Sequence, residues 1–162
     1  MFLWFCIPSI VGIAAIFRSP FLDYRLLGLG ASLPLVETMV GFQWLLHTLF
    51  FGVFVLSSIM FLGKGNRKIQ QKLLPLPIGL LTHLVLDGTW TEKEIFWWPV
   101  TGRDLMGIEV SRLEFSFLPN GIILETLGVM IALWGWRKFE LHKQVNMKAF
   151  IKRGHLVVLE DN

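Results

Sequence analysis

Five apolar segments, most of them separated by charged connections, are the feature that most limits how this chain can fold. They run over residues 1–17, 26–40, 41–63, 73–87 and 120–136. In all, 54% of the 162 residues are hydrophobic and 17% are charged, whereas soluble domains average about 45–50% and about 25%. Apolar runs of this kind are typical of helices that cross a bilayer core about 30 Å thick. We therefore expect an all-α fold, a polytopic membrane helical bundle with about five transmembrane helices.

The positive charges predict an orientation for such a bundle. The 18–25 and 64–72 connections and the tail from Arg137 hold 12 Lys and Arg residues, against 3 in the 88–119 loop. Loops rich in Lys and Arg face the cytoplasm. We expect a transmembrane bundle over 1–136, integral to the cell (inner) membrane. Its N-terminus and an outer loop at 88–119 would face outside, and a basic cytoplasmic tail over 137–162 would lie near anionic membrane lipid.

Other classes of protein are disfavoured by what the chain lacks. The sequence has no glycine-rich phosphate loop, no basic-aromatic nucleic-acid pattern and no internal repeat. We therefore expect no nucleic-acid partner. Its one cysteine, Cys6, rules out an internal disulfide.

Ionisable side chains inside the apolar segments are the candidate functional residues. Such groups are costly in a membrane, and their default interpretation is functional. In the predicted orientation they share one shallow layer, within about 9 Å of the outer boundary. They are Glu37, His47, His83, Asp87 and Glu125.

His83 and Asp87, in LLTHLVLDGTW (80–90), are four residues apart and so share one face of a helix. Two imidazoles and up to three carboxylates form the ligand set expected for Zn²⁺ or a similar divalent metal. The sequence therefore predicts a shared metal site. Two structural alternatives stay open. His83 and Asp87 could bond only to each other, and Glu125 could pair with Arg103 or Arg112.

Three stretches resemble the predicted membrane-bound metal-dependent hydrolases of the YdjM-like type, which are distantly similar to zinc-dependent phospholipase C. The stretches are GLGASLPLVE (28–37), LLHTLFFG (45–52) and LLTHLVLDGTWTEKEIFWWPVTG (80–102). The resemblance implies that the family's metal ligands fall on His47, His83 and Asp87, with its acidic position near Glu37. Leu35 follows Pro34 where many members have Asp, and residues 42–43 replace a His-Arg pair. These departures favour a single-metal site over a multinuclear one.

Two functions follow from these residues. The first is a membrane-embedded metal-dependent hydrolase acting on a phosphoester or ester, with a lipid as one possible substrate. Its metal would be held by His47, His83, Asp87 and Glu37, and Glu125 would be a general base or a hydrogen-bond partner of a metal ligand. In the outer loop, Asp104 would close over the site and Arg103 would contact a substrate phosphate. The alternative is a non-catalytic membrane scaffold or metal-binding subunit, because two ligands of the family pattern are missing.

Overall fold

A computed structural model describes residues 1–40, 45–102 and 120–156, and all regular secondary structure within these ranges is helical. The prediction of an all-α fold is therefore confirmed for this part of the chain. Its α-helices are α1 (Phe2–Phe17), α2 (Tyr24–Ser32), α3 (Pro34–Val40), α4 (Leu49–Leu62), α5 (Arg67–Leu73), α6 (Pro75–Asp87), α7 (Lys93–Phe96), α8 (Asn120–Lys138) and α9 (Gln144–Arg153). Two 3₁₀ turns, η1 (Leu45–His47) and η2 (Thr89–Thr91), precede α4 and α7.

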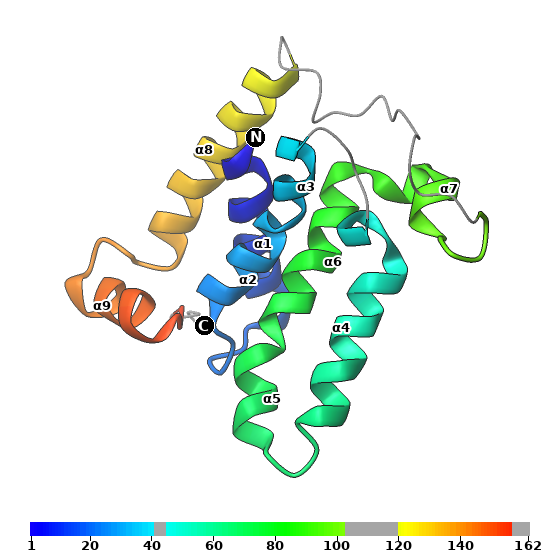
Figure 1. Ribbon diagram of the computed structural model, residues 1–162. Helices are drawn as coiled ribbons and strands as arrows, with labels where there is room; N and C mark the ends of the chain where they lie inside the picture. The colour runs from blue at the N-terminus through cyan, green and yellow to red at the C-terminus, as the bar shows by residue number, and fades with distance from the viewer. Residues whose placement is uncertain (41–44, 103–119, 157–162) are drawn as a thin grey trace.

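Helix α2 lies in the middle of the bundle (Figure 1). It packs against α1 on one side and α6 on the other, while α8 contacts α1 and α4 contacts α6. Helix α9 folds back to the start of α2, where Arg25 Nη1 donates to the Ile151 carbonyl at 2.6 Å and Tyr24 N–H donates to the Gly154 carbonyl at 2.8 Å. The end of α9 and the residue that follows it are thus attached to α2, the central helix of the fold.

Polar residues set the ends of the helices that matter for the site. The Asp23 carboxylate accepts the Arg25 N–H at the start of α2, and the Thr48 hydroxyl accepts the Phe51 N–H at the start of α4. Both are the N-cap residues that helices favour. Gly88 ends α6 with a φ of 75°, a left-handed conformation that glycine adopts without steric cost. Asp87 is therefore the last residue of a helix, next to a sharp change of chain direction.

The backbones of α2 and α6 approach each other unusually closely. A Cβ atom on Gly79 would lie 2.0 Å from the Leu27 carbonyl oxygen, and one on Gly30 would lie 2.1 Å from the Leu76 carbonyl oxygen. No side chain fits at either position without separating the helices. This pair of glycines therefore fixes the distance between α2 and α6, the two helices that orient His83.

The core lies where α1, α2 and the end of α8 meet. Its buried side chains include Val11, Ala14, Tyr24 and Leu27. The segment predicted as a basic tail contributes to it, because Phe139 is 2% exposed and Leu156 3% exposed. Phe150 of α9 also packs against this core, so the basic residues of α9 belong to a helix with an apolar contact to it.

The prediction of transmembrane helices is wrong for the part of the chain that the structure describes. None of the helices in 1–40, 45–102 and 120–156 combines the length and the hydropathy needed to cross a bilayer. The polytopic membrane bundle, its integral inner-membrane location, and its orientation with the N-terminus outside and the C-terminus cytoplasmic therefore lose their support.

The reason is that the described helices are either too short for a bilayer span or carry charged residues: α1, for example, has 16 residues and α6 has 13. The 26–40 run divides around Pro34 into α2 and α3, since proline has no N–H to continue a helix. Within the 41–63 run, α4 has 14 residues and spans about 21 Å, against a bilayer core of about 30 Å. Helix α8 has 19 residues but carries Glu125, Arg137 and Lys138.

Candidate metal centre

Two buried polar side chains lie on one face of α6. His83 is 0% exposed and Asp87 is 4% exposed, as expected for residues one helical turn apart that face the same neighbours. The ring of Phe5 from α1 lies against the His83 imidazole, with ring centroids 4.2 Å apart. Asp87 Oδ2 accepts a 2.6 Å hydrogen bond from the hydroxyl of buried Thr89. Both side chains are thus held in place by neighbours from outside α6 itself.

The orientation of the His83 ring is fixed by α2. His83 Nδ1 lies 2.7 Å from the Ala31 carbonyl oxygen, which only accepts hydrogen bonds, so Nδ1 carries the proton. Ala31 lies in the last turn of α2, where helix carbonyls have no donor within the helix. The close α2–α6 contact brings the two groups together. In this tautomer the lone pair of the neutral ring is on Nε2.

His47 reaches the same region from a different part of the chain. It ends the η1 turn directly before α4 and is 0% exposed. Its Nδ1 donates to Oε2 of Glu37 on α3 at 2.9 Å, and the Leu46 N–H donates to Oε1 of the same carboxylate at 2.9 Å. As in His83, the proton on Nδ1 leaves the lone pair on Nε2.

The three side chains His47, His83 and Asp87 form one compact group. Each offers a ligand atom, and these atoms all lie within 4.8 Å of one another. The two imidazole rings have centroids 5.5 Å apart at 79° to each other, an edge-on arrangement. This group could hold a metal ion, and the prediction of a shared divalent-metal site is confirmed to that extent.

The contacts around the group are those that metal-binding side chains need. Histidine ligands usually donate their second ring N–H to a carboxylate or a carbonyl, which fixes the tautomer and the ring plane. Here His47 donates to Glu37 and His83 to the Ala31 carbonyl. The hydrogen bonds thus run outward from the group to Glu37, Ala31 and Thr89.

Glu37, predicted as a fourth ligand, lies behind His47. Both of its carboxylate oxygens accept hydrogen bonds, one from Leu46 and one from His47, and the three-residue group does not include it. The structure therefore gives Glu37 the position of a support for a ligand.

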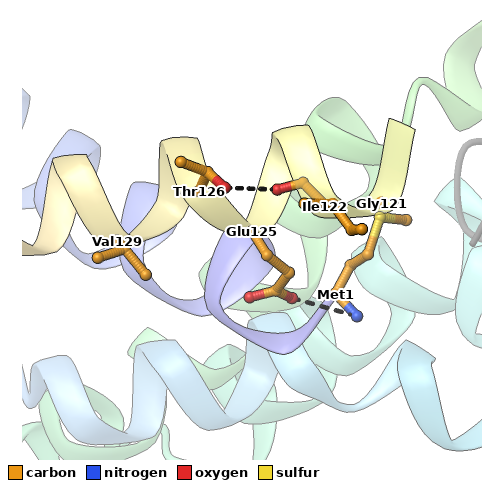
Figure 2. Close-up of a pocket in the computed structure, with 6 residues that line it drawn as sticks. All are labelled: Met1, Gly121, Ile122, Glu125, Thr126 and Val129. Atoms are coloured by element: carbon orange, nitrogen blue, oxygen red, sulfur yellow. Dashed lines mark hydrogen bonds and ion pairs between the residues drawn. The ribbon is translucent and has the colours of Figure 1, made fainter. Parts of the chain in front are cut away.

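Glu125, predicted as a general base, has a different neighbour. Figure 2 shows its carboxylate directed at the α-amino group of Met1, with Oε1 3.2 Å from the nitrogen. The two residues line an open hollow of about 510 Å³ beside the N-terminal half of α8, together with Gly121, Ile122, Thr126 and Val129. Glu125 is not a member of the His47–His83–Asp87 group, and the structure places it beside Met1.

The remaining predicted residues, Arg103 and Asp104, lie outside the described ranges, as does Arg112. The sequence reasoning missed Thr89 and Phe5, which contact Asp87 and His83. A hydroxyl two residues after Asp87, beyond a helix-ending glycine, is a signal that could have identified Thr89. Phe5 had no such signal, because its contact joins helices distant in the sequence.

Comparison with known proteins adds no relative to this description: no family model, curated protein or solved structure matches the chain.

Proposed function

We propose that this protein is a metal-dependent hydrolase that cleaves a phosphoester or an ester at a single divalent ion, with Zn²⁺ as the metal. The observation that carries the proposal is the convergence of His47, His83 and Asp87 within 4.8 Å. Two imidazoles and one carboxylate suit Zn²⁺. Three protein ligands also leave a fourth tetrahedral position open, which distinguishes catalytic zinc sites from closed structural ones.

Each residue of the group would have a defined task. Bound Zn²⁺ acidifies a water ligand and polarises a phosphoryl or carbonyl oxygen. His47 and His83 would present Nε2 to the ion, because their Nδ1 atoms donate to Glu37 and to the Ala31 carbonyl. The Thr89 hydroxyl holds Oδ2 of Asp87, which directs the carboxylate. The negative charge of Asp87 would reduce the net charge of a dication in this buried region.

The proposed substrate is less specific than the one expected from the sequence, because it no longer includes a lipid. The expectation of a lipid substrate depends on the depth of the site in a bilayer as well as on the family resemblance, and the bundle that gave this depth is not supported. The proposal is therefore limited to the phosphoester or ester group that is cleaved.

A non-catalytic metal centre is the second candidate, and the burial of the group favours it. His47 and His83 are 0% exposed and Asp87 is 4% exposed. A closed, structural ion would hold η1 and α6 together without needing access for a substrate. The two candidates agree on the ligands and differ in whether the ion reaches a substrate.

Metal content tests what the two candidates share. Protein purified with Zn²⁺ and then dialysed is expected to hold about one ion per chain by elemental analysis, whereas His83→Ala and Asp87→Asn are expected to lose it. Glu125→Gln removes a carboxylate outside the group and is the matched control, expected to retain the ion. Equal metal content in wild type and Asp87→Asn, with both proteins folded by circular dichroism, would refute the centre.

Hydrolysis then separates the candidates. Chromogenic phosphomonoesters, phosphodiesters and carboxylic esters are incubated with the wild-type protein, with and without a chelator. The hydrolase is expected to lose activity with the chelator, regain it with Zn²⁺, and show none in Asp87→Asn. A metal-loaded wild type that cleaves no member of the panel would favour the non-catalytic centre.

A further inference from the structure

Glu37 accepts hydrogen bonds with both of its carboxylate oxygens and lies outside the His47–His83–Asp87 group. Its side chain comes from α3 and accepts two hydrogen bonds from consecutive residues of η1, at 2.9 Å from Leu46 N–H and 2.9 Å from His47 Nδ1. One oxygen therefore holds the backbone of the turn, and the other holds the imidazole that the turn carries. The backbone and the side chain of His47 are restrained by the same carboxylate.

The turn itself supplies little of this restraint. Short 3₁₀ segments have poorer hydrogen-bond geometry than α-helices, and η1 is only three residues long. Thr48 closes the turn through its hydroxyl, which donates to the Leu45 carbonyl at 2.7 Å. This hydrogen bond restrains the backbone next to His47, but it does not involve the imidazole ring.

The two histidines of the group therefore depend on different kinds of support. His83 lies within the 13-residue helix α6, and its Nδ1 donates to a backbone carbonyl. A substitution does not remove that acceptor. His47 lies in a three-residue turn, and its Nδ1 donates to a side chain. Substituting Glu37 therefore removes the Nδ1 acceptor of one histidine and leaves the Nδ1 acceptor of the other in place.

We infer that Glu37 is a positioning residue that keeps His47 in the Nδ1-protonated tautomer with Nε2 directed into the metal centre. The inference rests on the metal centre of the proposed function. An anionic acceptor on Nδ1 also makes the imidazole a stronger electron donor to a metal. Loss of such an outer partner typically weakens metal binding by about 10- to 100-fold.

Two substitutions of similar size grade the effect. Glu37→Leu removes both acceptor oxygens, and Glu37→Gln keeps one oxygen but places an amide NH₂ against a donor. Zn²⁺ affinity, measured by competition with a chromophoric chelator, is expected to fall by about 10- to 100-fold in Glu37→Leu. Glu37→Gln is expected to fall between this variant and the wild type. Glu125→Gln, which also removes one glutamate charge, is expected to match the wild type.

The tautomer of His47 is a second measurement that needs no metal. In metal-free protein with isotope-labelled histidine, the ring nitrogen shifts are expected to show Nδ1–H at His47 in the wild type and a mixture of tautomers in Glu37→Leu. His83 is expected to keep Nδ1–H in both proteins, because its acceptor is the Ala31 carbonyl. A merely structural role for Glu37 would change stability without changing the tautomer of His47.

The outcomes distinguish this inference from the proposed function. If Glu37→Leu keeps the wild-type tautomer and the wild-type Zn²⁺ affinity, the inference is overturned while the metal centre stands. If the wild type binds no Zn²⁺, the metal centre fails, and an unchanged tautomer in metal-free Glu37→Leu still refutes the positioning role. If Glu37→Leu does not fold, a Glu37→Gln protein with unchanged tautomer and affinity overturns the inference.

Discussion

Replacing Gly79 with alanine should separate α2 from α6 and disturb His83. The new Cβ would lie 2.0 Å from the Leu27 carbonyl oxygen and 2.8 Å from the Ala31 nitrogen. Both contacts are to backbone atoms, which do not move aside as a side chain would. The helices must therefore separate, and the 2.7 Å hydrogen bond from His83 Nδ1 to the Ala31 carbonyl is expected to lengthen or break.

The magnitude follows from three effects. Overpacking costs about 1–3 kcal/mol, and a buried polar group that loses its partner costs about 1–3 kcal/mol. Alanine offsets about 1 kcal/mol, because it favours a helix more than glycine does. We therefore expect Gly79→Ala to lower the free energy of unfolding by about 3 kcal/mol, a large part of the about 5–15 kcal/mol that domains have.

Urea unfolding followed by far-UV circular dichroism measures this loss. Gly12→Ala is the matched control, because Gly12 also lies within a helix, α1, but a Cβ there meets no atom within 4 Å. That variant is expected to gain up to about 1 kcal/mol. If Gly79→Ala unfolds at the same urea concentration as Gly12→Ala, the close α2–α6 contact and its role in orienting His83 are refuted.

Three further predictions concern groups around the core and the site. Thr89→Val removes the hydroxyl that donates to Asp87 at 2.6 Å and should cost about 2 kcal/mol; an unchanged urea midpoint would contradict the bond. Burial alone would raise the pKa of Asp23, but hydrogen bonds and the charge of Arg25 outweigh it and lower the pKa. The stabilisation is therefore present above the unfolded pKa of about 3.9 and is lost as the pH falls through the lower folded value. The stability advantage of wild type over Asp23→Asn should accordingly disappear in acid, and a pH-independent difference would count against the ion pair. Burial raises the pKa of the Cys6 thiol, so iodoacetamide at neutral pH should alkylate it more slowly in folded than in urea-unfolded protein.

The helical class and the α6 pair could be predicted from the sequence for physical reasons. Long apolar runs without strand-like alternation favour helices, and the described residues are helical. The four-residue spacing of His83 and Asp87 places them on one helix face whatever the surroundings. His47 could be predicted as a third member of the metal site because a polar side chain among apolar neighbours is costly unless it has a partner.

The lengths of the helices could not be predicted in the same way. Composition shows that a run is apolar, but local breaks decide whether the run is one helix or several. Pro34 separates α2 from α3, and Gly88 ends α6. The sequence-based prediction makes the 26–40 run a single span across Pro34, and this is one of the five predicted spans that the structure does not support.

The role of Glu37 shows the remaining division. By itself the sequence determined that Glu37, two imidazoles and Asp87 lie in apolar stretches of the chain. Such groups need partners when they are buried. Only the tertiary structure decided which partner each group has: Glu37 contacts His47, Glu125 contacts Met1, and His83 contacts a carbonyl of α2. The physical reason is that hydrogen bonds act over about 3 Å, whereas sequence spacing fixes distances only within one helix.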